Sequence, residues 1–245
     1  MNRIILLPEE ITNPSEVVVE DSHRWTHLRD IIKVKVGTSI KVCVLGVGLT
    51  SATILCCEQT RGLLRIEDDH IEKGAEPWLS LYFGLCRPPT MQKVFEHGTA
   101  MGIGDYHLIQ GELSEKSYWK SKLIQKSFYQ KYLNLGLSQS LIYYQLPCLH
   151  TYRGLRDLQI ENGNGSKFFL DRDASKLFTD NPINWGEKIS FAVGPERGWT
   201  EAERDYFLEA GFTPVRISSA ILRVEHAIFH SVGQLELCRL KEGRK

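Results

Sequence analysis

The chain has 245 residues, of which 42% are hydrophobic and 24% are charged. This composition is typical of a globular protein, and the length is sufficient for one large or two small domains. The formal net charge is zero, so no overall positive field would attract nucleic acid. The six cysteines form no C-x-x-C pair, which argues against a zinc or disulfide framework and predicts reduced thiols and no metal.

The first ten residues, MNRIILLPEE, do not resemble a signal peptide, because the apolar run is short and two acids follow it. No apolar stretch approaches the length of a membrane span. We therefore expect a cytoplasmic protein without a membrane partner.

Residues 1–72 contain short β-forming runs separated by glycines, a pattern that predicts a small barrel or sandwich. The runs are IILL, SEVVVE, SIKVCVL, TSATILC and LLRIE. The segment 22–32 differs from them and can form a short helix. Residues 72–77 contain Gly74 and Pro77 and are expected to form a linker to a second domain at 77–245.

Strands and helices alternate after Pro77, which predicts an α/β domain with a parallel sheet. Buried strands are expected at 79–85, 106–111, 167–171, 189–193 and 213–217. Helices are expected at 90–103, 114–135, 201–210 and 224–241.

The stretch from Lys116 to Arg156 contains no Asp or Glu, and aromatic residues are interleaved with its basic ones. Lysines contact phosphates and aromatic rings stack on unpaired bases. The stretch as a whole favours an RNA- or partner-facing surface. For any one residue, a solvated helix whose aromatic side chains face the core is the preferred interpretation. The candidates for RNA contacts are Arg24, Arg29, Arg87, Lys120, Lys122, Lys126 and Lys131.

The motif Gly194-Pro195-Glu196-Arg197-Gly198 stands between an expected strand and helix. Thr200-Glu201-Ala202-Glu203 fits a capping box, so the helix begins there and the motif is a separate loop. A second polar loop, 217–223, follows the next strand. Ligands bind at the carboxyl ends of strands in open α/β sheets, so the two loops could hold one small ligand. The spacing alone is equally met by ordinary strand-to-helix turns without a ligand, which remain the alternative.

The two loops, with the sequences GPERG-W-T-x-x-E and I-L-R-V-E-x-A, resemble the RsmE family. Its members are SPOUT-class methyltransferases that methylate N3 of a uridine in small-subunit ribosomal RNA. The segment from His27 to Gly37 is similar to the PUA-like RNA-binding domain of that family. The resemblance implies a PUA-like β-barrel at 1–72, a trefoil-knotted α/β domain at 77–245, the cofactor S-adenosylmethionine and a homodimer.

The resemblance also implies the residues of the site. Arg223 and Glu225 match the family's L-R-x-E and are expected to be catalytic, with a plain structural ion pair as the alternative. The cofactor is expected to contact Leu170, Gly194, Pro195, Glu196, Gly198, Ile217, Ser218, Ser219 and Leu222.

Departures from the family pattern leave other functions open. Arg197 stands where the family has Gly, and a positive φ there would strain it by roughly 1–2 kcal/mol. The pattern K-x-x-E-L-G-V is expected at 97–103, where the chain lacks its Lys and Glu. A non-catalytic RNA-binding or ribosome-assembly protein on the same fold is therefore the main alternative. The hypothesis of an unrelated nucleotide enzyme is supported only by Gly102-Ile103-Gly104. This is a weak signal, because a dinucleotide-binding glycine motif follows a strand and this one follows a helix.

Overall fold

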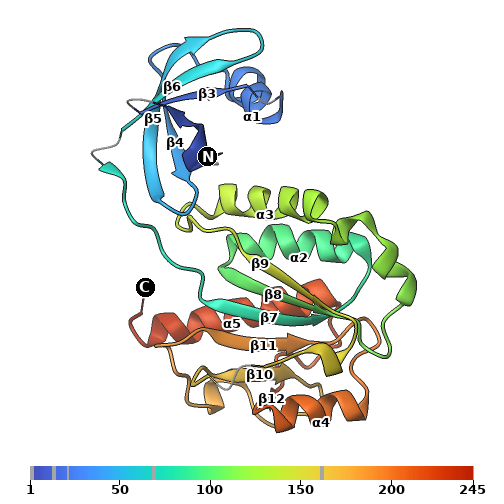
Figure 1. Cartoon of the computed structure of the whole chain (residues 1–245). Helices are drawn as coiled ribbons and strands as arrows, with labels where there is room; N and C mark the ends of the chain where they lie inside the picture. The colour runs from blue at the N-terminus through green and yellow to red at the C-terminus, as the bar shows by residue number, and fades with distance from the viewer. Residues whose placement is uncertain (1–2, 13–14, 21, 68–69, 161–162, 245) are drawn as a thin grey trace. The chain divides into compact units, whose positions relative to one another are not determined.

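The computed structural model describes residues 3–12, 15–20, 22–67, 70–160 and 163–244 (Figure 1). The chain divides into two compact units. The first consists of Met1–Glu76 and Leu137–Leu146, and the second of Pro77–Gly136 and Pro147–Lys245.

The segment Leu137–Leu146 lies in the first unit, whereas chain order alone had placed it with the second domain. The reason is long-range backbone pairing. Arg3 donates its N–H to the carbonyl of Ser138 at 2.8 Å, and Gly46 donates to Tyr144 at 2.8 Å. Local periodicity carries no signal for such pairing.

The first unit contains a six-stranded sheet with the order β1-β4-β5-β6-β3-β2. β1 and β4 are parallel, and the other neighbours are antiparallel. The strands are β1 (Ile4–Leu6), β2 (Ile11–Thr12), β3 (Glu16–Val19), β4 (Ser39–Val44), β5 (Gly48–Cys57) and β6 (Gly62–Ile66).

A short helical segment fills the core of this unit. It consists of α1 (Ser22–Thr26) and a π-helical turn at His27–Ile32. Trp25 and Leu28 are fully buried against alternate residues of the strands. The Trp25 indole also donates to the carbonyl of Glu58 at 3.0 Å, so its polar edge is satisfied.

The second unit contains a six-stranded sheet with the order β12-β10-β11-β7-β8-β9, and every neighbouring pair is parallel. All residues of the central strand β7 are buried, as expected for a sheet covered on both faces. The strands are β7 (Leu79–Gly84), β8 (Ile103–Ile109), β9 (Cys148–Tyr152), β10 (Lys167–Leu170), β11 (Ile189–Val193) and β12 (Thr213–Val215).

Helices cover both faces of this sheet. α2 (Pro88–Ala100) and α5 (Val224–Lys241) lie on one face, and α4 (Glu201–Glu209) lies on the other (Figure 1). Phe95 of α2 packs edge-on against Tyr106 of β8, and Phe207 of α4 packs on the opposite face near Phe169 of β10. The α/β domain with a parallel sheet expected from the alternating pattern is therefore present.

Two elements differ from the sequence prediction. The helix expected at 114–135 begins later, because two 3-10 turns at Lys116–Lys120 and Lys122–Ile124 precede α3 (Lys126–Ser140). The side chains of Glu115 and Ser121 accept backbone N–H groups and so cap the start of each turn separately. The edge strand β9 was missed, since it is half exposed and shows no regular apolar alternation.

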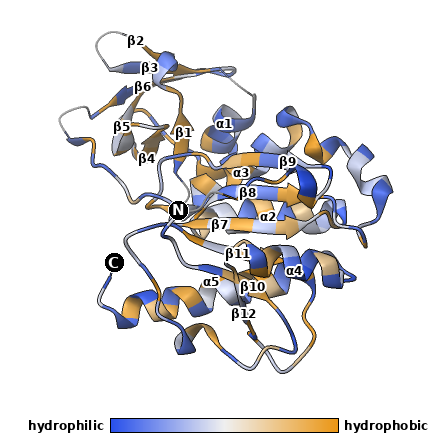
Figure 2. Ribbon diagram, turned by 60° about the horizontal axis from the view of Figure 1, so that its bottom comes forward, coloured by the Kyte–Doolittle hydropathy of each residue, from blue (hydrophilic) through white to orange (hydrophobic). Residues whose placement is uncertain are grey.

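α5 carries hydrophobic and hydrophilic residues along its length (Figure 2). The apolar positions Val224, Ile228, Val232 and Leu235 are buried, whereas Leu237 and Leu240 stay more than half exposed. No helix among the described residues is long and apolar enough to cross a membrane.

The expected capping box begins α4. Thr200 donates its N–H to Glu203 Oε2 at 2.8 Å, and Glu203 donates its N–H to Thr200 Oγ1 at 3.4 Å. Glu203 Oε1 also accepts the N–H of Glu112 at 2.9 Å, so this buried carboxylate joins α4 to the chain after β8.

Replacing Glu203 with Ala should lower the free energy of unfolding by about 1–3 kcal/mol, because it leaves two part-buried backbone donors without their acceptor. Glu201→Ala is the matched control, since Glu201 is exposed in the same helical turn and should contribute under about 1 kcal/mol. Urea denaturation followed by circular dichroism measures both values. Equal losses in the two variants would contradict this account of Glu203.

Candidate functional site

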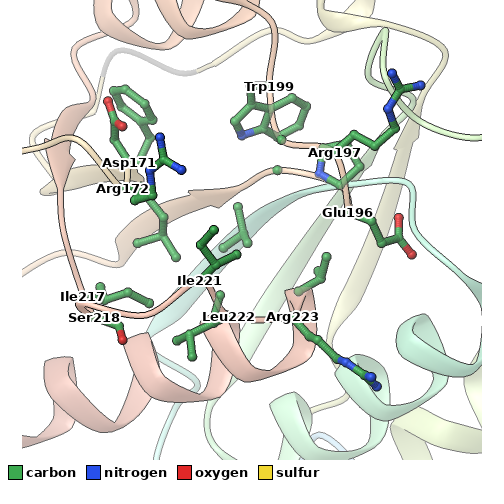
Figure 3. Close-up of a pocket in the computed structure, with 18 of the residues that line it drawn as sticks. Asp171, Arg172, Glu196, Arg197, Trp199, Ile217, Ser218, Ile221, Leu222 and Arg223 are labelled. Carbon is green, nitrogen blue, oxygen red and sulfur yellow. The ribbon is translucent and has the colours of Figure 1, made fainter.

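A cavity of about 790 Å³ lies at the carboxyl ends of β10, β11 and β12 in the second unit (Figure 3). These strands are neighbours and run in the same direction, so the loops that follow them meet at one edge of the sheet. The starts of α2 and α5 complete the wall. This is where α/β sheets bind ligands, and the two loops predicted from the sequence do come together.

The GPERG loop forms a tight turn. Gly198 donates its N–H to the carbonyl of Pro195 at 2.8 Å, which closes a β-turn with Glu196 and Arg197 at its centre. A Cβ on Gly194 would lie 2.9 Å from the Cα of Gly198 and 3.1 Å from the backbone nitrogen of Trp199. Gly194 is therefore required by a close backbone approach.

The positive φ of this loop belongs to Gly198, at 75°, and not to Arg197. The condition for strain at Arg197, a positive φ at that position, is therefore not met. An arginine fits the central position of the turn without a conformational cost.

Two further contacts fix the loop to its neighbours. Pro195 packs so closely on Gly84, at the end of β7, that a Cβ on this glycine would overlap the proline ring. The Glu196 carboxylate accepts the N–H of Arg87 at 2.9 Å, just before α2 begins. The loop is thus anchored to both the sheet and a helix.

The second loop is held by the last helix. Gln234 of α5 donates to the carbonyl of Ile217 at 2.7 Å, and the Ser218 hydroxyl accepts the N–H of Ala220 at 3.0 Å. Ile217, Ser218 and Leu222 line the cavity, and Ile221 is 81% exposed at its edge. Ser219 is exposed and does not belong to the lining, unlike the other expected cofactor residues.

The third part of the wall follows β10. Leu170 lines the cavity as expected, and Asp171 beside it accepts from Arg204 at 2.5 Å and from the N–H of Asp173 at 2.9 Å. Sequence reasoning missed Asp171 and Arg204, because 33 residues separate them and only the packing of α4 brings them together.

Arg223 and Glu225 both line the cavity at the start of α5, but their environments differ. Arg223 is exposed. Glu225 is buried and pairs with Lys93 of α2 at 3.3 Å. Burial raises the pKa of the Glu225 carboxyl, but a backbone hydrogen bond and Lys93 outweigh it and hold the pKa below its ordinary value.

Lys93 is a residue that sequence reasoning missed. The family spacing K-x-x-E-x-G is met by Lys93, Glu96 and Gly98, four residues before the register expected at 97–103. The Lys and Glu of that pattern are therefore present in the chain. The ion pair across α2 and α5 places this lysine beside the cavity.

Two features of the wall fit a bound small molecule. The indole nitrogen of Trp199 is buried and has no hydrogen-bond partner among the described residues. At Gly194 the lining is backbone, since a Cβ there would meet the backbone of Gly198 and Trp199 in the same loop. In the described part of the chain, no group of three or more His, Cys, Asp or Glu side chains could hold a metal ion.

The residues expected to contact RNA lie in different environments. Arg87 lines the cavity and is exposed. In the first unit, Arg24 pairs with Glu10 at 2.5 Å, and Arg29 pairs with Asp30 at 2.6 Å. These two guanidinium groups therefore have structural partners. The lysines of the acid-free stretch, all of which are exposed, are Lys120, Lys122, Lys126 and Lys131.

The chain is similar to known methyltransferases over most of its length. Residues 74–236 match the family described as RNA methyltransferase domain. The chain is 28% identical to ribosomal RNA small subunit methyltransferase E of Treponema pallidum, over 93% of this chain and 87% of that protein. It is also 28% identical to ribosomal RNA small subunit methyltransferase E 1 of Borreliella burgdorferi, over 83% of this chain and 85% of that protein.

A solved structure shares the fold. It is ribosomal RNA small subunit methyltransferase E from Neisseria gonorrhoeae bound to S-adenosyl methionine, with a TM-score of 0.80 and 21% identity over 97% of this chain and 98% of that one. The family match spans well over half of the chain and includes every residue of the cavity wall. The chain therefore belongs to the RNA methyltransferase domain family, and its resemblance to the RsmE group is confirmed.

Proposed function

We propose that the protein is an S-adenosylmethionine-dependent methyltransferase that modifies N3 of a uridine in small-subunit ribosomal RNA. The observation that carries this proposal is the cavity, which is built from the two motif loops and the end of β10 within the matched family region. The names of the relatives give the class of RNA and of reaction. The uridine and its N3 atom come from the motif resemblance.

The residues of the wall suit the cofactor. Leu170, Ile217 and Leu222 offer apolar contacts, while the closely packed backbone around Gly194 offers amides at short range. When bound, S-adenosylmethionine supplies an electrophilic methyl group. The remaining task of the protein is to align the accepting nitrogen and to help remove its proton.

The two motif residues of α5 have different proposed roles. A general base works best with a pKa near the operating pH, whereas the pKa of Glu225 is lowered and its carboxylate is held by Lys93. We therefore assign Glu225 a positioning role at the start of α5. Arg223 is exposed at the cavity and is the better candidate for direct contact with the RNA.

N3 lies on the Watson–Crick edge, so the target uridine must be unpaired or turned out of a helix. The first unit, as a PUA-like RNA-binding domain, and the lysines of α3 and the preceding turns would hold the flanking RNA. A trefoil knot in the second unit belongs to the same proposal. Its support is the resemblance of the two motif loops to the RsmE family.

A cytoplasmic location also belongs to the proposal, because the six cysteines are free thiols and the RNA substrate is in that compartment. A homodimer is supported by large apolar side chains that are exposed to solvent in a single chain. Ile221 is 81% exposed, Leu237 54% and Leu240 55%.

Gly194→Val and Leu222→Asp should each abolish binding of S-adenosylhomocysteine, measured by titration calorimetry. The first forces a side chain into backbone at 2.9 Å, and the second places a charge in the cavity wall. Gly154→Ala is the control, since a Cβ there meets no atom within 4 Å. Unchanged affinity in both cavity variants would remove the cofactor from this site.

Replacing Lys120, Lys122, Lys126 and Lys131 with Gln should weaken RNA binding and flatten its dependence on salt. Each lost phosphate contact removes about one released counterion from the slope. The affinity for S-adenosylhomocysteine serves as the internal control and should not change, because none of these lysines lines the cavity. Identical salt slopes for both proteins would show that the lysines only solvate their helix.

The proposed dimer should have twice the mass of one chain in light scattering at micromolar concentration. The double variant Leu237→Lys and Leu240→Lys should dissociate it, since two charges would enter an apolar contact. A wild-type protein with the mass of a single chain would contradict the proposed dimer.

A further inference from the structure

We propose that Arg197 is an RNA-backbone contact at the mouth of the cavity, where its guanidinium group binds a phosphate beside the target nucleotide. The inference rests on the proposed function. It assigns a role to a residue that lies in the cofactor loop but faces away from the cofactor side.

The turn geometry separates Arg197 from the cofactor wall. Glu196 and Arg197 occupy the centre of the turn that Gly198 closes onto Pro195. Their side chains therefore project outward from the base that Gly194 forms. Figure 3 shows Arg197 extending away from Ile217 and Ser218, on the opposite side of the cavity.

The side chains of the two central residues of the turn differ in their partners. Glu196 is fixed by the N–H of Arg87 at 2.9 Å. Arg197 is exposed and has no carboxylate partner among the described residues, whereas Arg172 and Arg204 of the same wall pair with Asp173 and Asp171. An unpaired cation on an anchored turn is already positioned for an anion.

Arg197 also has neighbours of the same kind. Arg87 and Arg223 line the same cavity from the starts of α2 and α5, and neither forms an ion pair within the described chain. Figure 3 shows the side chains of Arg197 and Arg223 extending in different directions, with Glu196 between them. Three arginines from three segments thus line one cavity at spaced positions, in a chain whose net charge is zero.

A nucleic-acid backbone is the anion that this arrangement fits. Guanidinium groups bind phosphate through two parallel hydrogen bonds, and several spaced phosphates match several spaced arginines. The other anion available at the site is the single carboxylate of the cofactor. It would need a donor directed into the cavity, whereas Arg197 is directed out of it.

The test compares Arg197→Gln, Arg197→Lys and wild type for binding to a small-subunit ribosomal RNA transcript at several salt concentrations. Arg197→Gln should lower RNA affinity by about five- to tenfold at low salt and reduce the salt slope by about 0.7–0.9, the value for one phosphate contact. Arg197→Lys should retain the slope, since it keeps the charge, and recover part of the affinity. Arg244→Gln is the control, because Arg244 is an exposed arginine outside the cavity.

Binding of S-adenosylhomocysteine and the melting temperature complete the experiment, and both should match wild type in every variant. An Arg197→Gln variant with the wild-type salt slope would overturn the inference. A loss confined to S-adenosylhomocysteine affinity would also overturn it, because the guanidinium group would then serve the cofactor carboxylate. If wild type binds neither RNA nor S-adenosylhomocysteine, the proposed function itself fails, which is a different result.

Discussion

The close packing of Pro195 on Gly84 is the constraint on which the cavity depends. No side chain fits between the end of β7 and the GPERG loop, so the loop lies directly on the sheet. Gly194 and Gly198 approach within contact distance of each other and bring the chain back toward α4. This part of the cavity wall is therefore backbone whose position relative to the sheet is fixed. The capping box that begins α4 at Thr200 comes directly after it in the chain. A side chain added at Gly194 would displace the loop and the start of the helix together, whereas one added at Gly198 would be strained by the positive φ of that residue.

The acidic groups near the cavity are occupied by the fold itself. Glu196 accepts a backbone N–H before α2, Glu203 accepts two before and beside α4, and Glu225 holds Lys93. Each carboxylate joins elements that are distant in sequence. Glu225 is charge-compensated by Lys93, whereas Glu196 and Glu203 keep their charge and are held by backbone N–H groups. Arginines still outnumber carboxylates in the lining of the cavity, six to four. A chain with no net charge can in this way present a positive opening to a polyanion.

The sequence predicted the features that depend on local pattern. The alternation after Pro77, the capping box and the meeting of two loops at strand ends all follow from neighbouring residues. Prediction from sequence failed for features that depend on contacts between segments distant in the chain. β9 is a half-exposed edge strand whose pairing with β8 has no local signature. The Asp171–Arg204 pair depends on how α4 packs, and Lys93 was missed because the family pattern was placed four residues too late.

The GPERG motif shows why some positions of such a loop are restricted and others are not. Gly194 is restricted by contact with Gly198, and Gly198 by its positive φ. Pro195 is restricted by its packing on Gly84, and Glu196 by the N–H of Arg87. Arg197 has none of these restrictions, since its φ is not positive and its side chain leaves the loop toward solvent. A substitution there can change what the mouth of the cavity attracts without altering the wall behind it. Under the RNA contact proposed for Arg197, variation at this position would let a methyltransferase adjust its hold on RNA and keep the proposed cofactor site.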